Sequence, residues 1–548
     1  MTVCFGSSGF AQNGVTLVGQ LDQRHGGPGP FYSFYYASCW GYVAPDGHEY
    51  ALIGTYSGTS IIDLDATPIQ EVAYIPGSNS EWKELKTWGH YAYCVSEGSQ
   101  GVQIINLSQL PDTAWLVRTI FTAGPRNITT NHSVSVGDGY LFLNGSGSGG
   151  GGTIILSLAN PEFPAYVGEY QPDYLHDVYV LRDTLYGAGI YGSGVWIASL
   201  QNHAAPQQIG HVTYSGAGTH NTWVSPNGRF LYTSDEIGST PKNLKVFEIN
   251  QYQPTFSFTP RTPSTLNPSE IIHNIHGRGN FIYIAHYAAG VYVADVHNPL
   301  AITNAGGYDT FAGAGGGYIG CWGVYPYFPS GRIIGSDTQT GLYVFTFSGL
   351  QPRTRSTLLA PTDGDTLSLN PPATFRWRYA ASQLEDPHYY QLHVYGPGVD
   401  TLMRTSGITV QVGALSGMQE GQTYNWHVWI KDEFTSVSSA DTMQFVYSTS
   451  TVDVESPEET PVVFGLKQNY PNPFNPSTRI AFSIPASGFT RLQVFNVLGE
   501  EVATLLENHL AAGEHEVEFN ASSIPSGIYL YKLSTGKFSE VKKLVVMK

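Results

Sequence analysis

The chain has 548 residues, a net charge of −17 at pH 7 and only 13% charged residues, about half of the ~25% that is typical of soluble domains. At roughly 100–200 residues per domain, this length predicts several domains. The 62 Gly, 36 Tyr and 10 Trp residues argue against disorder and suit short strands joined by tight turns. The acidic balance argues against a nucleic-acid partner. No run of 18 apolar residues occurs, so no transmembrane helix is expected.

The first segment, residues 1–12, reads MTVCFGSSGFAQ. Gly9 and Ala11 have the spacing of a signal-peptide cleavage site, but the segment has no basic residue and its apolar stretch is short. We expect either the end of a signal peptide that begins upstream or a disordered N-terminus.

Residues 13–349 repeat with a period of about 45 residues, which is the length of a four-stranded propeller blade. Each unit opens with Trp or His, and two alternating strands, a Gly-rich gap and a third strand follow. The openings of the seven units are Trp40, Trp82, His132, His176, His220, His273 and Trp322. The pattern predicts an all-β, seven-bladed β-propeller. Six blades are the alternative if the region 70–130 is irregular.

The last unit lacks a fourth strand, because GLYVFTFSG (341–349) leads directly into the next segment. The N-terminal stretch GVTLVGQL (14–21) has the pattern of the missing strand. We therefore expect the N-terminal strand to complete the final blade and to close the ring. Closure removes the exposed sheet edges that otherwise promote aggregation.

Three segments follow the repeats. Residues 350–447 contain about seven short alternating strands, which predict a sandwich like fibronectin type III or immunoglobulin domains. We expect Trp377 and Trp426 in its core and a spacer role. Residues 448–463 are an acidic linker rich in Ser, Thr and Pro. Residues 464–548 have the strands and turns of a small C-terminal β-sandwich.

The unit openings are the main candidates for chemistry, because the innermost strand of a blade starts beside the central channel. The ends of the second strands should face the same channel mouth. The residues expected there are Trp40, Trp82, His132, His176, Asp177, His220, Asp235, Glu236, His273, His286, Trp322 and Asp337. We expect His276 on a strand surface instead.

Imidazole and carboxylate are the usual ligands of Zn²⁺, Mn²⁺ and Fe²⁺, and they also suit acid–base work near neutral pH. A divalent metal could therefore be held by four residues, His132, His176, His220 and His273. The competing interpretation, which the sequence favours, is that each imidazole bonds neighbouring backbone and holds the blades together.

Two cysteines, Cys39 and Cys321, each precede a Trp-Gly pair in the first and seventh units. These units are neighbours in a closed ring, so a disulfide could form there in an oxidising compartment. Two buried thiols are the alternative, and the one favoured here. Cys94 lies within a strand and is expected in the core.

The third strands SIIDL, VQIINL and VYVADV resemble LVIVD repeats. Together with GHYAYCVSE, HDVYV, THNTW, SDE, IIHNI and WGVYPYFPSG, they resemble the choice-of-anchor B proteins. This resemblance implies a secreted bacterial propeller and brings no established activity.

The C-terminal motifs FGLKQNYPNPFNPSTRIAFSIP, LQVFNVLGEEVATLL, GEHEVEF, IPSGIYLYKL and KKLVVMK closely resemble the type A sorting domain of the type IX secretion system. That resemblance implies export across the outer membrane of a Gram-negative bacterium. It also implies cleavage of the domain, followed by release or by attachment to surface lipopolysaccharide.

The leading functional hypothesis is a secreted or surface-held protein that binds a glycan, peptide or small ligand at the channel mouth. The alternative is a metal-dependent hydrolase or lyase, with a metal held by the imidazoles and with Asp235 or Glu236 as base. A purely structural surface protein is the third hypothesis. Binding is favoured over catalysis, because the common hydrolase motifs are missing from the sequence.

Overall fold

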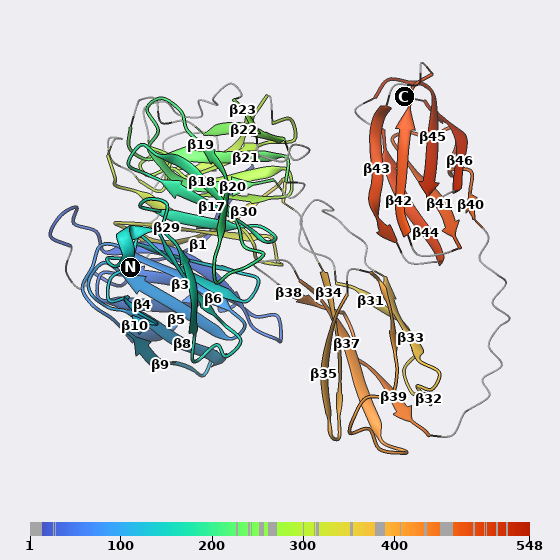
Figure 1. Cartoon of the computed structure of the whole chain (residues 1–548), viewed down its shortest axis with the longest axis horizontal. Coiled ribbons are helices and arrows are strands. Elements are labelled where there is room, and N and C mark those ends of the chain that lie inside the picture. The colour runs from blue at the N-terminus through green and yellow to red at the C-terminus, as the bar shows by residue number, and fades with distance from the viewer. Residues whose placement is uncertain are drawn as a thin grey trace. The chain divides into compact units, whose positions relative to one another are not determined.

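The computed structural model describes residues 14–25, 27, 29–225, 228–238, 242, 244–250, 257–260, 271–299, 301–311, 313, 317–350, 355–378, 389–405, 407–431, 436–449, 464–485, 488–497, 499, 501–510, 513–521, 524–536 and 538–547. The chain divides into two compact units, and the main boundary between them lies between Arg355 and Ser356 (Figure 1). Within the described residues all regular structure is β, apart from one 3₁₀ turn at Gly149–Gly151.

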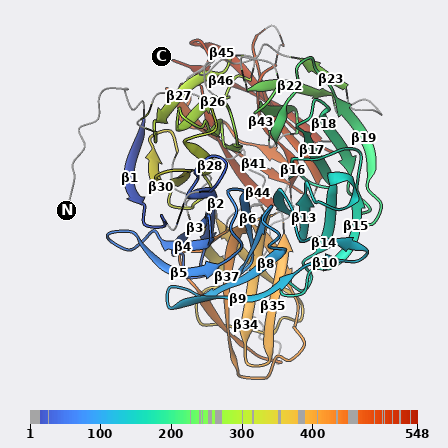
Figure 2. The ribbon, with the colours of Figure 1, turned by 90° about the vertical axis from the view of Figure 1, so that its left-hand side faces the viewer.

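Among its described residues, the first unit contains seven four-stranded antiparallel sheets, which follow one another around a ring (Figure 2). Sheet 1 holds β2 (Tyr36–Val43), β3 (Glu49–Thr55), β4 (Gly58–Asp63) and β5 (Gln70–Pro76); sheet 2 holds β6 (Lys83–Trp88), β7 (Tyr91–Ser96), β8 (Val102–Gln109) and β9 (Thr113–Ile120); sheet 3 holds β12 (Ser133–Gly137), β13 (Tyr140–Asn144), β14 (Thr153–Ser157) and β15 (Ala165–Tyr170); sheet 4 holds β16 (Asp177–Val180), β17 (Thr184–Gly189), β18 (Gly194–Ser199) and β19 (Gln207–Val212).

Sheet 5 holds β20 (Thr219–Val224), β21 (Phe230–Asp235), β22 (Lys245–Asn250) and β23 (Ser257–Pro260); sheet 6 holds β24 (Ile275–Arg278), β25 (Phe281–Ala285), β26 (Val291–Asp295) and β27 (Thr303–Tyr308); sheet 7 holds β28 (Cys321–Tyr325), β29 (Arg332–Asp337), β30 (Gly341–Phe347) and β1 (Val15–Leu21). A two-stranded ribbon, β10 (Thr122–Ala123) with β11 (Arg126–Asn127), is separate from these sheets.

Sheet 7 is assembled from both ends of the repeat region. β1 runs antiparallel to β30, with Val15 opposite Phe347 and Leu21 opposite Leu342. Val15 is fully buried and belongs to an apolar cluster with Phe345 and Phe347. The N-terminal strand therefore occupies the fourth position of the last sheet, the place that the sequence leaves open.

The burial of the strands explains their composition. All residues of β3 (EYALIGT) and β4 (GTSIID) are buried, because each of these strands is covered on both faces. Strands of that kind read as continuous rather than alternating apolar runs. β5 and β19, at the outer end of their sheets, are mostly exposed or half-buried. The seven sheets thus direct their first strands toward the centre of the ring.

An ion-pair network joins the first and last sheets. Arg332 on β29 lies 3.1 Å from the buried carboxylate of Glu49 on β3, and 2.6 Å from Asp65. The Ser330 hydroxyl donates to the same Glu49 carboxylate at 2.6 Å. Side chains therefore reinforce the junction between sheets 1 and 7, close to the strand pairing of β1.

The second unit begins with a two-sheet sandwich. One sheet has the order β31 (Thr357–Ala360), β33 (Ala373–Arg378), β36 (Thr409–Val412); the other has β32 (Asp365–Leu367), β39 (Met443–Tyr447), β37 (Thr423–Lys431), β34 (Tyr389–Gly396), β35 (Val399–Thr405), with β38 (Ser436–Ser438) paired to β37. Trp377 and Trp426 are both fully buried, as predicted. Phe375 meets Trp426 edge to face at 5.1 Å between ring centroids.

The C-terminal residues form another pair of sheets. One has the order β40 (Gly465–Leu466), β41 (Ser477–Ile484), β44 (Gly513–Asn520), and the other β43 (Glu501–Leu510), β42 (Gly488–Phe495), β45 (Gly527–Thr535), β46 (Phe538–Val546). Their inner faces share one apolar core, which includes Phe474, Ile480, Leu492 and Tyr531. The predicted leader segment 1–12 and residues 450–463 of the predicted linker lie outside the described residues.

Candidate functional site

Four imidazoles from four consecutive sheets form a row at the centre of the ring. Neighbouring ring centroids are 3.9 Å apart between His132 and His176, 4.1 Å between His176 and His220, and 3.9 Å between His220 and His273. His132 and His176 directly precede β12 and β16, His220 is the second residue of β20, and His273 lies two residues before β24. The repeat alignment therefore brought these four residues together correctly.

A shared backbone contact helps to explain why three of the imidazoles meet. The amides of His132, His176 and His273 each donate to the carbonyl oxygen at or near the end of the second strand of the same sheet. His132 donates to Asn144 at 3.0 Å, and His176 to Ala188 at 2.8 Å. His273 makes the same bond to Ala285 at 2.9 Å. Equivalent positions in successive sheets point into the same space around the ring axis.

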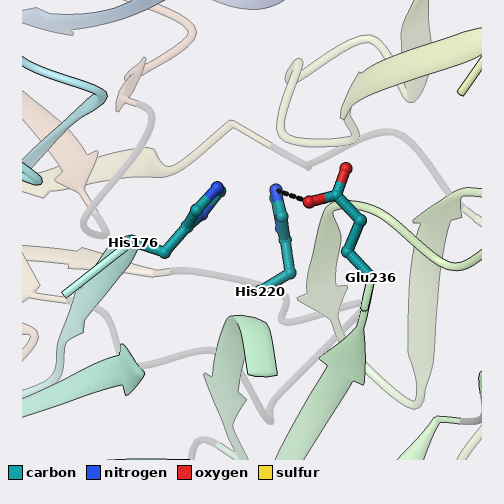
Figure 3. Close-up of side chains that lie close together, drawn as sticks. All are labelled: His176, His220 and Glu236. Atoms are coloured by element: carbon teal, nitrogen blue, oxygen red, sulfur yellow. Dashed lines mark ion pairs between the residues drawn. The ribbon is translucent and has the colours of Figure 1, made fainter. Parts of the chain in front are cut away.

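Glu236 adds a carboxylate to this row (Figure 3). Its Oε2 lies 3.8 Å from His220 Nε2, and its Oε1 lies 3.7 Å from His273 Nε2. The Tyr287 hydroxyl donates to Oε1 at 2.6 Å. One ligand atom each from His176, His220 and Glu236 lie within 4.8 Å of one another. Small side-chain movements would bring all three atoms within bonding distance of one small cation.

Burial sets the protonation of the row. It holds the pKa of His176 and of His220 well below the usual value, and neighbouring imidazoles act in the same direction. Burial lowers the pKa of His273 to about 3. These three side chains are therefore neutral at physiological pH and can offer lone pairs. Burial also raises the pKa of Glu236, against the opposing effect of the Tyr287 hydrogen bond.

His132 differs from the other three imidazoles. Burial alone would lower its pKa, but the hydrogen bond and the charge of Glu97 outweigh burial and raise that pKa. The Glu97 carboxylate lies 2.6 Å from His132 Nδ1. His132 therefore has its own carboxylate partner and is the imidazole best suited to carry a proton.

A cavity of about 290 Å³, partly open to solvent, lies over this row. Six of the seven sheets contribute to it, and two Trp side chains stand beside the imidazoles. Its lining residues are Trp82, Lys83, Glu84, His132, Ser133, His176, Asp177, His220, His273, Asn274 and Trp322. The predicted mouth residues Trp82, Asp177 and Trp322 are therefore placed with the imidazoles.

The prediction for Trp40 is wrong, because the Cys-Trp-Gly motif lies farther along β2 than the same motif lies along β28. Tyr36 pairs with Thr55, the last residue of β3, but Cys39 already pairs with Ile53. In sheet 7, Cys321 pairs with Asp337, the last residue of β29. Cys321 therefore corresponds to the start of β2, and Trp40 lies farther along its strand than Trp322 does.

Trp40 lines a second cavity instead. This cavity encloses about 540 Å³, part of it open solvent, and its aromatic lining residues are Trp40, Tyr179, Trp223 and His276. His276 thus faces a cavity rather than an exposed strand surface, which corrects its predicted place. Asp177 lines both cavities and accepts a hydrogen bond from the side-chain amide of Asn221.

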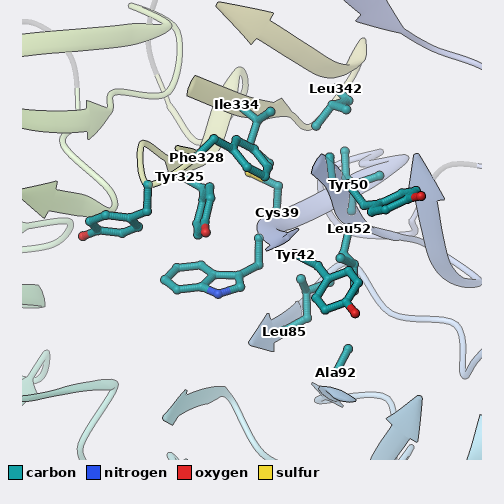
Figure 4. Close-up of a cluster of buried hydrophobic side chains, with 14 of the residues drawn as sticks. Cys39, Tyr42, Tyr50, Leu52, Leu85, Ala92, Tyr325, Phe328, Ile334 and Leu342 are labelled. Atoms are coloured by element: carbon teal, nitrogen blue, oxygen red, sulfur yellow. The ribbon is translucent and has the colours of Figure 1, made fainter. Parts of the chain in front are cut away.

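Cys39 and Cys321 are free, buried thiols, as is Cys94. Figure 4 shows Cys39 among apolar side chains that include Leu52 and Ile334. The Cys321 thiol lies 3.5 Å from the carbonyl oxygen of Gly323. The disulfide is therefore not formed, and the two cysteines occupy different positions along the first strands of their sheets.

Three predicted carboxylate and imidazole positions lie away from the row. Asp235 is fully buried, accepts a hydrogen bond from Tyr214 at 2.6 Å and forms an ion pair with Lys245. Asp337 accepts from Thr310 at 2.7 Å and caps the turn that follows β29. His286 packs on Tyr292 and contacts the Ile271 carbonyl. These three side chains therefore make their contacts within single sheets or loops and not with the imidazole row.

Sequence reasoning missed Glu97 and Tyr287. Glu97 directly follows β7, as Glu236 directly follows β21, so the same position after the second strand could have identified it. Tyr287 lies two residues after β25, beside His286. The repeat units show no preference for tyrosine at that position, so the sequence did not point to Tyr287.

Comparison with known families identifies the C-terminus. Residues 468–547 match the family described as secretion system C-terminal sorting domain. No curated protein matches the chain.

Solved structures resemble the chain only distantly. The periplasmic gluconolactonase of Pseudomonas aeruginosa is 15% identical with a TM-score of 0.42, covering 57% of this chain and 92% of that one. A protein from Lactobacillus plantarum is 13% identical with a TM-score of 0.41, covering 55% and 89%. Hydrazine synthase of Kuenenia stuttgartiensis is 10% identical with a TM-score of 0.41, covering 58% and 96%. These scores are too low to support an argument about fold or activity.

The chain is an all-β protein that carries an export tail. The tail is of the type IX kind, so the protein is secreted or held at the outer cell surface of a Bacteroidetes-type Gram-negative bacterium. Across the described residues, no helix has the length and apolar character needed to cross a membrane.

Proposed function

We propose that residues 13–349 are a seven-bladed β-propeller of the LVIVD, choice-of-anchor B kind, and that it binds a small extracellular ligand at the mouth of its central channel. Seven four-stranded sheets in a ring support the blade count, and the pairing of β1 with β30 supports closure by the N-terminal strand. The sandwich of residues 350–447 would act as a spacer. Attachment to surface lipopolysaccharide after removal of the tail is part of this proposal.

The observation that carries the proposal is the cavity over the imidazole row. It combines the side chains of Trp82 and Trp322 with neutral imidazoles and the half-buried Asp177. Aromatic faces together with a few fixed polar groups are typical of sites that bind small molecules, sugars included. Trp322 already packs on His273, with 4.7 Å between ring centroids.

A binding screen on the full chain tests this function. We expect a glycan, peptide or small-molecule panel to yield a ligand whose affinity falls at least tenfold in Trp82→Ala, because stacking on an anchor residue contributes more than about 1 kcal/mol. Trp115→Ala is the matched control, since Trp115 is 38% exposed on β9 and should leave affinity unchanged. Ligands that bind both variants alike would place recognition elsewhere.

A metal-dependent hydrolase or lyase is the second candidate, and the nearness of Glu236 to three neutral imidazoles favours it. In such an enzyme the base could not be Asp235, which is paired with Lys245. Glu84, Glu97, Asp177 and Glu236 are carboxylates that lie near the row.

Removal of the C-terminal domain gives a separate prediction. We expect a chain that ends before residue 464 to accumulate inside the cell envelope, because the matched sorting residues 468–547 are gone. Immunoblots of medium, surface and periplasmic fractions measure the distribution. Deletion of residues 356–447 is the control, because it shortens the chain and keeps the tail. Secretion of the tail-less chain at the normal level would contradict the sorting role.

A further inference from the structure

We infer that His176, His220 and Glu236 form a binding site for a divalent transition metal of the zinc class, and that Tyr287 positions the carboxylate. This inference rests on the proposed function, because it names what occupies the channel mouth. Zn²⁺ is commonly bound by two histidines and one glutamate, with a further position left for water or a ligand.

The distances fit a cation between the side chains better than a direct contact. His220 Nε2 and Glu236 Oε2 are 3.8 Å apart, which is too long for a hydrogen bond. Two tetrahedral ligands at about 2.0–2.2 Å from a metal are separated by roughly 3.4 Å. Small side-chain rotations would therefore bring both atoms to bonding distance.

The tautomer of His273 places a lone pair beside the carboxylate. Its Nδ1 lies 2.6 Å from the carbonyl oxygen of Trp322, and a carbonyl can only accept, so Nδ1 carries the hydrogen. In the neutral ring Nε2 is then an acceptor, and it faces Glu236 Oε1 at 3.7 Å. Two acceptors face each other here, an arrangement that a nearby cation would stabilise.

The Glu236 carboxylate is oriented by a hydrogen bond to its Oε1 atom. The Tyr287 hydroxyl donates to Glu236 Oε1, which leaves Oε2 turned toward His220. Hydrogen bonds of this kind to a ligating carboxylate fix its orientation at metal centres. Tyr287 is thus a positioning residue, and the three ligands come from two neighbouring sheets, sheets 4 and 5.

The competing interpretation, that the imidazoles only bond the backbone of the next sheet, accounts for part of the row. His273 Nδ1 contacts the carbonyl oxygen of Trp322. His176 interacts in a similar way with the backbone of His220, and His220 with the backbone of His273, although their Nδ1 atoms do not reach hydrogen-bond geometry. These backbone contacts do not explain the Glu236 carboxylate, whose Oε2 faces His220 Nε2 at 3.8 Å.

Zinc titration of the full chain, after removal of metal with a chelator, tests the site. We expect one equivalent of Zn²⁺ to bind and X-ray absorption to report nitrogen and oxygen neighbours without sulfur. We expect His220→Gln and the nearly isosteric Glu236→Gln each to weaken binding at least tenfold. Tyr287→Phe should weaken it by about 10–100-fold, as is typical for groups that orient a ligand.

His48→Gln is the matched control, because His48 also lies beside a carboxylate, Asp46, but on the exposed surface. It should leave the affinity for Zn²⁺ unchanged. Circular dichroism of each variant checks that the fold is kept. The inference is overturned if the wild type binds no stoichiometric Zn²⁺, or if both site variants bind it as tightly as His48→Gln does.

Repeating the ligand screen with and without Zn²⁺ separates the two proposals. Loss of the metal site alone would leave Trp82-dependent ligand binding intact. A metal site without any ligand that depends on Trp82 would instead contradict the proposed function and keep this inference.

Discussion

Replacing Val15 with aspartate is expected to destabilise the ring by at least about 4 kcal/mol, because it buries an unpaired charge. Val15 is fully buried at the start of β1, among Tyr283, Phe345 and Phe347. Its strand is the one that completes sheet 7. Hydrogen exchange of peptides from β30 and β29, read by mass spectrometry on the full chain, should show a large loss of protection.

Val18→Asp on the same strand is the matched control. Val18 is 55% exposed, so its carboxylate would remain in water and the change should cost less than about 1 kcal/mol. Equal effects of the two substitutions would mean that β1 does not close the ring.

Trp377→Ala is expected to destabilise the sandwich by about 3–5 kcal/mol, the range for removing a fully buried aromatic side chain. Trp377 lies on β33 and packs on Tyr390 of β34, with 5.5 Å between ring centroids. The substitution leaves a cavity between the two sheets. Exchange protection should fall in β33 and β34, and the strands of sheets 1–7 should keep theirs.

Leu402→Ala serves as the control in the same sandwich, because Leu402 is 51% exposed on β35. It should change stability by about 0.5 kcal/mol or less. Loss of protection in the ring after Trp377→Ala would show that the two parts do not unfold separately.

Local sequence patterns were enough to predict much of the fold. The alternation in residues 14–21 and the missing fourth strand after residue 349 were enough to predict the pairing of β1 with β30. The position of the Cys-Trp-Gly motif in its strand could not be predicted in the same way. Cys39-Trp40-Gly41 and Cys321-Trp322-Gly323 have the same letters, yet Cys321 is opposite the last residue of β29 and Cys39 is opposite a residue two positions before the end of β3. Identical letters do not fix strand register, because register is set by the hydrophobic pattern of the whole strand and by its turn.

The sequence predicted those site residues that occupy the same position in several repeat units. It could not choose between two adjacent residues at the end of a strand. Side chains alternate between the two faces of a strand, so adjacent residues at its end point in opposite directions. Glu236 faces the imidazoles while Asp235 pairs with Lys245, and Tyr287 faces them while His286 does not. Asp235 and Glu236 have the same chemistry, and the sequence alone cannot fix which member of either pair turns inward.

The pairing of β1 with β30 also orders events during folding. Val15 and Phe347 are joined across roughly 330 residues, and closing a loop of that length costs about 5 kcal/mol of chain entropy on a logarithmic scale. Within the ring, β1 is synthesised before the other strands, and it can pair only after β30, the last of them, has been made. We therefore expect a late, slow closing step, during which β1 and the edge of β30 are both unpaired and vulnerable to association with other chains.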